Sequence, residues 1–352
     1  MAESLQSDSV ADMLISTLKD LGRPNWNEIA SDYQEYTGFN DLLRMRKKTL
    51  GGGQSVQRQI AVTTPGNARR LGAYAVINSN ANDALLQVTS PHRLYGTNYS
   101  VDEYLLAQNQ HDPAQIVNEI QKARWGGMQD LAELTEPDIW GVPTDSADTD
   151  MIHGFKYWLV YNATAGHNGG AASGFTTVGG INPTTYAGWK NYTFNYAAVN
   201  EDDLLDKWRT ASKKCSFKPP VAIPEYQGGG MDWSWYTTEV VDNALLKLTR
   251  NQNENLKLQL YDAGGTPVFR SVPVQWVPAL DDANVAAARS DPIYGVNWKT
   301  FELNSLTGFF MRELPPIRPS DQPLVRTVHV FLSFNLLCTN RRKNMIGAKV
   351  QP

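Results

Sequence analysis

The chain has 352 residues, 41% of them apolar, so it can bury a sizeable core in one elaborate domain or in two or three modest ones. Its net charge of -4 argues against a surface that holds nucleic acid by bulk positive charge, so any contact with DNA must be local or weak. Residues 1–8 contain no secretory leader, and no segment is apolar enough to span a membrane. The two cysteines, Cys215 and Cys338, indicate buried thiols in a reducing cytosol.

The first fifty residues predict a short helical arm. Ser9–Leu21 carries its apolar residues on one helical face, and a second helical stretch runs from Ile29 to Leu43. A basic run, 44–48, follows, and three consecutive glycines at 51–53 interrupt the chain. The arm therefore ends at a flexible break.

An extended hairpin comes next. Residues 54–62 alternate between polar and apolar, a polar tip spans 63–70, and a second extended run covers 73–88. These strands hold too few large apolar residues to make a core of their own, so we expect the hairpin to lie along something else.

The strongest helix signal spans 112–134, where Asp112 is the expected N-cap and Pro113 the first helical residue. Such a helix would be about 33 Å long. Gly126 and Gly127 would let another chain or strand pack closely, and Pro137 is expected to end the element. The apolar stripe that should face inward consists of Ile116, Ile120, Ala123, Gly127, Leu131 and Leu134.

Helices and strands mix in the remainder of the chain, with a glycine-rich stretch at 163–180. Helices are predicted at 200–213 and 232–250. Strands are predicted at 155–162, 221–223, 256–261, 267–277, 298–303 and 325–337. The order is a hairpin, a long helix and then mixed elements, which predicts an α+β fold rather than an alternating βαβ fold.

No pattern of a catalytic or cofactor site stands out. The chain has no phosphate-binding GxxxxGK, no HExxH and no GxSxG, so we predict no enzyme, no cofactor and no metal. The acidic residues Asp145, Asp148 and Asp150 lack the glycine and closing glutamate of an EF-hand and are interpreted as a solvated loop, as is His167. The ten tryptophans are interpreted as core residues rather than a sugar-binding platform.

Three segments, 178–186, 189–191 and 335–342, together with the order of elements, resemble the major capsid proteins of tailed bacteriophages. The resemblance implies the Hong Kong 97-like fold. It implies an N-terminal arm at 1–49, an extended loop at 50–100, a peripheral domain at 101–185 with the spine helix 112–134, an axial domain at 186–305, and a C-terminal strand at 306–352 returning to the peripheral domain.

The partners follow from the same resemblance. The chain would assemble with itself, as pentamers and hexamers, into an icosahedral shell around double-stranded DNA. A separate scaffolding protein, a portal and a cement protein would accompany it, and assembly would take place in the host cytoplasm, giving a virion component. Some family members join their subunits through a lysine of the extended loop, but residues 51–109 contain no lysine, so we predict a non-covalent shell.

The expected contacts between subunits come from basic residues at two places: Arg69 and Arg70 in the extended loop, and Arg341, Arg342 and Lys343 after the last predicted strand. Two other functions remain open at this level. One is an encapsulin-like nanocompartment shell, and the other is a secreted polysaccharide-binding or polysaccharide-active protein.

Overall fold

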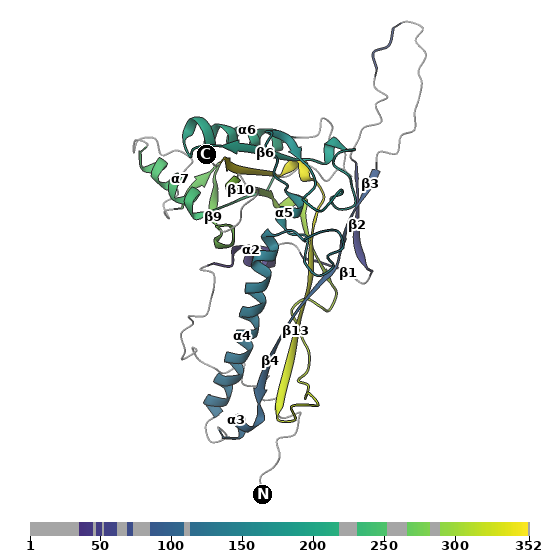
Figure 1. The fold of residues 1–352 in the computed structure, drawn as a ribbon, viewed down its shortest axis with the longest axis vertical. Helices are drawn as coiled ribbons and strands as arrows, with labels where there is room; N and C mark the ends of the chain where they lie inside the picture. The colour runs from purple at the N-terminus through teal and green to yellow at the C-terminus, as the bar shows by residue number, and fades with distance from the viewer. Residues whose placement is uncertain are drawn as a thin grey trace.

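A computed structural model describes residues 35–44, 47–50, 53–61, 69–72, 85–108, 113–217, 231–251, 266–281 and 289–350. The helix predicted at 9–21, the strands predicted at 221–223 and 256–261, and the N-cap Asp112 lie outside these residues. Within them the predicted α+β class is confirmed, because long helices pack beside sheets that are mainly antiparallel (Figure 1). No helix in the described ranges is long and apolar enough to cross a membrane.

A seven-stranded sheet forms the upper part of the molecule in Figure 1. Its strands, from one edge to the other, are β5 (Gly166–Gly169), β6 (Asn191–Tyr196), β14 (Met345–Val350), β10 (Arg289–Asn297), β7 (Trp233–Thr237), β9 (Val272–Trp276) and β8 (Val268–Phe269). Helices α6 (Asp206–Cys215) and α7 (Glu239–Asn251) accompany it. Short helical turns complete this part: η1 (Ala187–Trp189), η2 (Glu201–Leu205), η3 (Pro278–Leu280), η4 (Trp298–Thr300) and η5 (Arg341–Lys343).

A second, five-stranded sheet extends away from the first. It contains β1 (Lys47–Leu50), β11 (Phe301–Leu306), β13 (Val325–Cys338), β12 (Arg312–Glu313) and β4 (Arg93–Asp102). The long strand β13 pairs with β4 over its first ten residues and with β11 over its last four. Helix α4 (Pro113–Trp140) runs beside β4, and α3 (Glu103–Gln108) lies between them in the chain (Figure 1). We call α4, β4 and β13 the spine arm.

The predicted spine helix is confirmed, but it is longer than expected. It continues through Pro137 to Trp140, about 42 Å in all, because Ile139 and Trp140 are buried and hold the last turn against the core. Leu134 is 51% exposed, so its place in the inward stripe is wrong. Gly127 lies against Tyr99 of β4, as a close strand contact requires, whereas a side chain at Gly126 would meet open space.

Two local predictions are wrong. The strand expected at 155–162 is a short helix, α5 (Phe155–Trp158), whose apolar residues are all buried, and a short buried run does not reveal its period. The helix expected at 232–250 starts later, at Glu239, because its first residues form the strand β7. In β7 the rings of Trp233 and Trp235 stack on one face with their centres 5.0 Å apart, as residues i and i+2 of a strand do. The helix expected at 200–213 is confirmed as η2 followed by α6.

The predicted hairpin exists as β2 (Ser55–Ala61) paired with β3 (Leu85–Pro91). Its base packs on its own chain, because Val56 and Val88 belong to the main core and Arg58 forms an ion pair with Glu302 at 2.9 Å. Most of the expected tip and most of the second run fall in 62–68 and 73–84, outside the described residues, whereas residues 69–72 are described.

The two sheets share the C-terminal part of the chain, and the division between them does not coincide with the boundary expected at 305/306, which stays a prediction. Strand β11, from the segment assigned to the axial domain, joins the five-stranded sheet. Strand β14, from the segment expected to return to the peripheral domain, lies inside the seven-stranded sheet between β6 and β10.

A short N-terminal helix, α2 (Thr37–Arg44), packs beside α4. There the carboxylate of Glu136 accepts hydrogen bonds from the backbone N–H groups of Gly38 and Phe39.

Candidate functional site

Arg341 lies at the junction of the two sheets and is fully buried. Its Nε donates to the carbonyl oxygen of Trp158 at 2.6 Å, and Nη1 donates to that of Trp189 at 2.9 Å. Nη2 donates to the carbonyl oxygen of Gly170 at 2.8 Å and to Oδ1 of Asn191 at 3.1 Å. The prediction that Arg341 contacts another subunit is therefore corrected, because its guanidinium is used inside its own chain.

The surroundings of Arg341 are built from backbone. Burial lowers the pKa of Arg341 to about 10, which still leaves the group charged at neutral pH. Its charge is balanced by carbonyl dipoles and an amide. The loop approaches so closely that a Cβ added at Gly169 would lie 1.9 Å from Oδ1 of Asn191. We call Arg341 and the four oxygen atoms that it binds the Arg341 node. The node joins η1, α5 and the strand β6 into one unit.

The two residues that follow Arg341 differ in burial: Lys343 is buried and Arg342 is exposed. Lys343 is also buried, with its Nζ 5.1 Å from the centre of the Phe217 ring, so its predicted subunit contact is corrected for the same reason. Arg342 is exposed and lies 5.8 Å from the same ring. Arg69 and Arg70 are exposed too. A contact of Arg69, Arg70 or Arg342 with another subunit stays a prediction.

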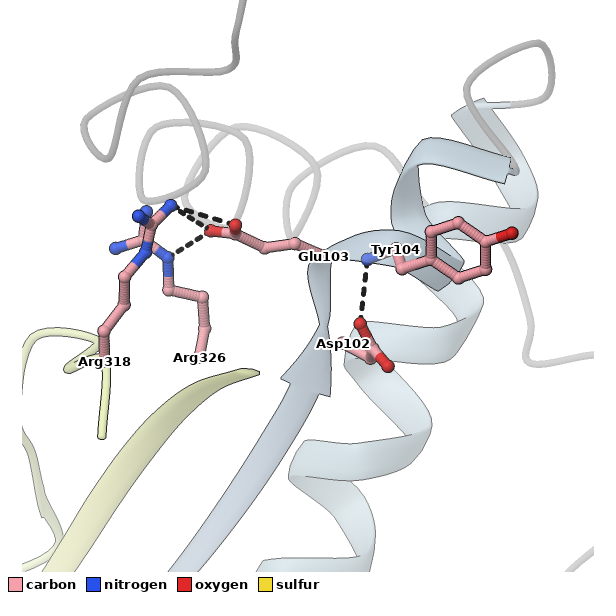
Figure 2. A network of polar contacts seen from close by, with 5 residues as sticks. All are labelled: Asp102, Glu103, Tyr104, Arg318 and Arg326. Atoms are coloured by element: carbon pink, nitrogen blue, oxygen red, sulfur yellow. Dashed lines mark hydrogen bonds and ion pairs between the residues drawn. The ribbon is translucent and has the colours of Figure 1, made fainter. Parts of the chain in front are cut away.

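The far end of the spine arm carries a charged cluster that the sequence did not reveal (Figure 2). Glu103 starts α3, and Arg318 and Arg326 converge on its carboxylate. Burial would raise the pKa of Glu103, but the hydrogen bonds from Arg326 and Arg318 outweigh it and lower the pKa. Asp102 accepts from the backbone N–H of Tyr104 at 2.8 Å, which fixes the turn between β4 and α3.

Exposed apolar side chains surround this cluster. Tyr104, Ile317 and Leu324 are each at least 50% exposed. They are close to it because Glu103 donates its backbone N–H to Leu324 at 2.8 Å and Ile317 pairs with Thr327 on β13. Exposed apolar side chains that lie together in this way often mark a surface that contacts another protein. Tyr104 is more than 200 residues from Ile317 and Leu324 in the sequence, so no local sequence pattern could predict that they lie together.

The buried titratable groups form no catalytic constellation within the described ranges. Burial lowers the pKa of both His153 and His167 to about 4, so both are neutral at physiological pH. Asp145 and Asp148 accept hydrogen bonds from backbone N–H groups of their own exposed loop. No group of three or more His, Cys, Asp or Glu among the described residues could hold a metal ion.

Cysteine and tryptophan side chains mostly serve packing. Cys215 and Cys338 are buried, as predicted, and burial raises the pKa of the Cys338 thiol to about 12. Five tryptophans are almost completely buried: Trp140, Trp158, Trp189, Trp208 and Trp235. These five rings lie inside the core and cannot stack on a sugar, so at least half of the tryptophans serve packing rather than polysaccharide binding.

No protein-family model matches the chain, and no curated protein matches its sequence. Solved structures do match. A chain in the capsid asymmetric unit of cyanophage A-1(L) superposes with a TM-score of 0.59 at 12% identity, covering 94% of this chain and 98% of that chain. The chain has the fold of a tailed-phage capsid protein.

Other capsid chains give the same result. The capsid of the native GTA particle matches with a TM-score of 0.55 at 11% identity, over 94% of this chain and 96% of that chain. The capsid of the Myoviridae phage XM1 matches with a TM-score of 0.54 at 10% identity, over 95% and 97%. The Hong Kong 97-like resemblance stated from the sequence is thereby confirmed at the level of the capsid fold.

Proposed function

We propose that this chain is the major capsid protein of a tailed bacteriophage, and that its copies assemble into an icosahedral shell around double-stranded DNA. The observation that carries the proposal is the match to a phage capsid chain over nearly the whole length of both chains, 94% and 98%. Such a match includes the spine arm and both sheets, so it is more than a shared local motif. The proposed role is structural and needs no catalysis.

The molecule is built in a way that suits this role. Among the described side chains, the far end of the spine arm has a small core of Tyr99, Val328 and Val330. Apolar side chains such as Tyr104 and Leu324 remain exposed there. In a closed shell each copy repeats the same modest contacts, and symmetry multiplies them into a stable assembly.

The proposed partners follow from the same role. The chain would associate with itself as pentamers and hexamers, and a separate scaffolding protein, a portal and a cement protein would act with it. Contacts with packaged DNA would be weak, since the chain carries a net charge of -4. Assembly in the host cytoplasm and location in the virion are part of the same proposal.

The test is to express the full chain, alone and together with the product of the neighbouring gene, and to examine the lysate by sedimentation and electron microscopy. Closed, roughly spherical particles of uniform size are the expected result. A chain that stays monomeric under both conditions, with a cooperative unfolding transition, would refute the proposal.

A second measurement concerns the far end of the spine arm. Replacing Ile317 and Leu324 with aspartate should reduce particle yield, because the change places charges on a surface that we expect to be covered. The control is Leu134→Asp, which also alters an exposed leucine, at 51% exposure, but on α4 near the junction of the two sheets. Equal yields of the double variant and the wild type would show that this end of the arm makes no important contact.

A further inference from the structure

A groove opens at one edge of the seven-stranded sheet, where α2 and α7 meet β9. It encloses about 730 Å³, and Glu35, Asp41 and Asp242 line it. No cation is among the described residues that line it. Burial raises the pKa of Asp242, and the charge of Glu239 raises it further, so these acids repel one another. We call this feature, with Glu239 at its border, the acidic groove.

The lining of the acidic groove suits a cationic occupant. Glu35, Asp41 and Asp242 give it negative charge. Lysine and arginine side chains carry the complementary positive charge and only donate hydrogen bonds, which carboxylates accept.

Cations gather at the opposite edge of the same sheet. Lys213 and Lys214 end α6 and are exposed, and Arg342 is exposed on η5. They lie close to β5, because the charges of Arg342 and Lys214 both act on His167 of that strand. No ion pair joins any of these three cations to a residue in the described ranges. We call Lys213, Lys214 and Arg342 the basic cluster.

The order of the strands keeps the two features apart. From β5 to β9 there are five strand spacings, about 24 Å at the usual distance between neighbouring strands. A chain therefore cannot place its basic cluster in its own acidic groove, but a second copy can. A contact between two different edges is heterologous, and repeated around an axis it closes a ring.

We propose that neighbouring copies join through this sheet, with the basic cluster of one copy bound at the acidic groove of the next. The inference rests on the proposed function, and it goes further by naming the two surfaces that meet. Exposed charges of opposite sign would steer the copies into register as they associate, and high salt would weaken the contact.

Other parts of the same chain fit the groove less well. Residues 1–34 precede Glu35 and contain six acidic residues against two basic ones. Residues 252–265 precede Thr266 and contain two acidic residues and one lysine. Both segments have the same sign of charge as the groove, which would repel them, whereas the basic cluster carries three positive charges.

The test is a charge exchange in the full chain, under the conditions in which the wild type forms particles. The variant K213E/K214E and the variant E35K/E239K should each lower particle yield about tenfold, since like charges then face each other. The combined fourfold variant restores opposite signs and should recover most of the yield. Sedimentation measures the particles, and circular dichroism checks that each subunit is folded.

The matched control is K122E/K299E, which makes the same change in charge at two other exposed lysines. Neither residue lines the acidic groove or belongs to the basic cluster, so particle yield should change little. Normal yield for both paired variants, or no recovery in the fourfold variant, would overturn the inference while the wild-type particles uphold the proposed function.

A further arm distinguishes the other exposed arginines. If E35K/E239K is rescued by R69E/R70E instead of by K213E/K214E, the occupant of the groove is the extended loop of a neighbour and the inference is wrong.

Discussion

The junction of the two sheets and the far end of the spine arm are stabilised in different ways. The junction has a large core in which Trp158, Phe155 and Leu336 are fully buried around Arg341. The described side chains of the far end form a core of three buried residues, and the ion pairs of Glu103 with Arg318 and Arg326 add to it. The difference teaches that one chain can be held by a large core at one end and mainly by a few charged contacts and a small core at the other.

The largest expected effect tests the junction. Arg341→Met leaves the carbonyl oxygens of Trp158, Trp189 and Gly170 without their donor, and we expect a loss of about 3–5 kcal/mol in the free energy of unfolding. The control is Arg342→Met, at an exposed position, which should change it by less than about 0.5 kcal/mol. Urea unfolding of the unassembled subunit measures both. Equal midpoints for the two variants would contradict the account of the node.

The second effect is the dependence of the free energy of unfolding on pH. His153 is buried against Tyr157, and burial lowers its pKa from 6.5 to about 4, with a smaller contribution from Arg93. Because the unfolded chain then takes up the proton first, stability falls as the pH drops through 6.5 towards 4. Between pH 7.5 and 4.5 this single group costs about 2–3 kcal/mol.

His153→Phe keeps an aromatic ring and removes the titration. The wild type should therefore lose about 2–3 kcal/mol more than the variant over this pH range, as measured by urea unfolding at both pH values. A parallel decline of the two proteins would show that His153 is not responsible for acid sensitivity at the junction.

The third effect is smaller and local to the spine arm. Glu103→Gln removes the negative charge that Arg318 and the buried Arg326 share, at an expected cost of about 1–2 kcal/mol. Hydrogen exchange should quicken at the β4–β13 end near Asp102 while the junction keeps its protection. Asp102→Asn is the control, because the amide oxygen can still accept from Tyr104. An equal change in both variants would refute a special role for Glu103.

The last prediction is that no covalent bond joins the subunits. Since residues 51–109 contain no lysine, mature particles boiled in SDS should give one band of single subunits. A ladder of joined subunits would mean that a bond forms from another part of the chain.

The elements that sequence patterns predicted well are those whose own residues determine them. The spine helix has a period of three to four over many turns, and β13 is a long apolar run, so both were placed within a few residues at one or both ends. The segment at Phe155 and the start of β7 failed because a few aromatic residues fit either period until the surrounding core selects one.

The candidate surfaces were harder to predict because they depend on long-range packing. The basic run Arg341–Lys343 looks exposed in sequence, yet a tight turn directs two of its three side chains inward. There Arg341 donates to carbonyl groups of α5 and η1, and Lys343 lies near the Phe217 ring. The cluster at Glu103 joins residues more than 200 positions apart. Only the exposure of Arg69, Arg70 and Arg342 agrees with the expected surface positions.

The position of β14 also governs the timing of folding. This strand lies in the interior of its sheet, parallel to β6 and antiparallel to β10, so the ladder cannot close until residue 350 has emerged from the ribosome. Until then β6 and β10 lack the strand that lies between them. A chain that lacks β14 would therefore leave the facing edges of β6 and β10 unpaired, and such open edges can pair with other strands.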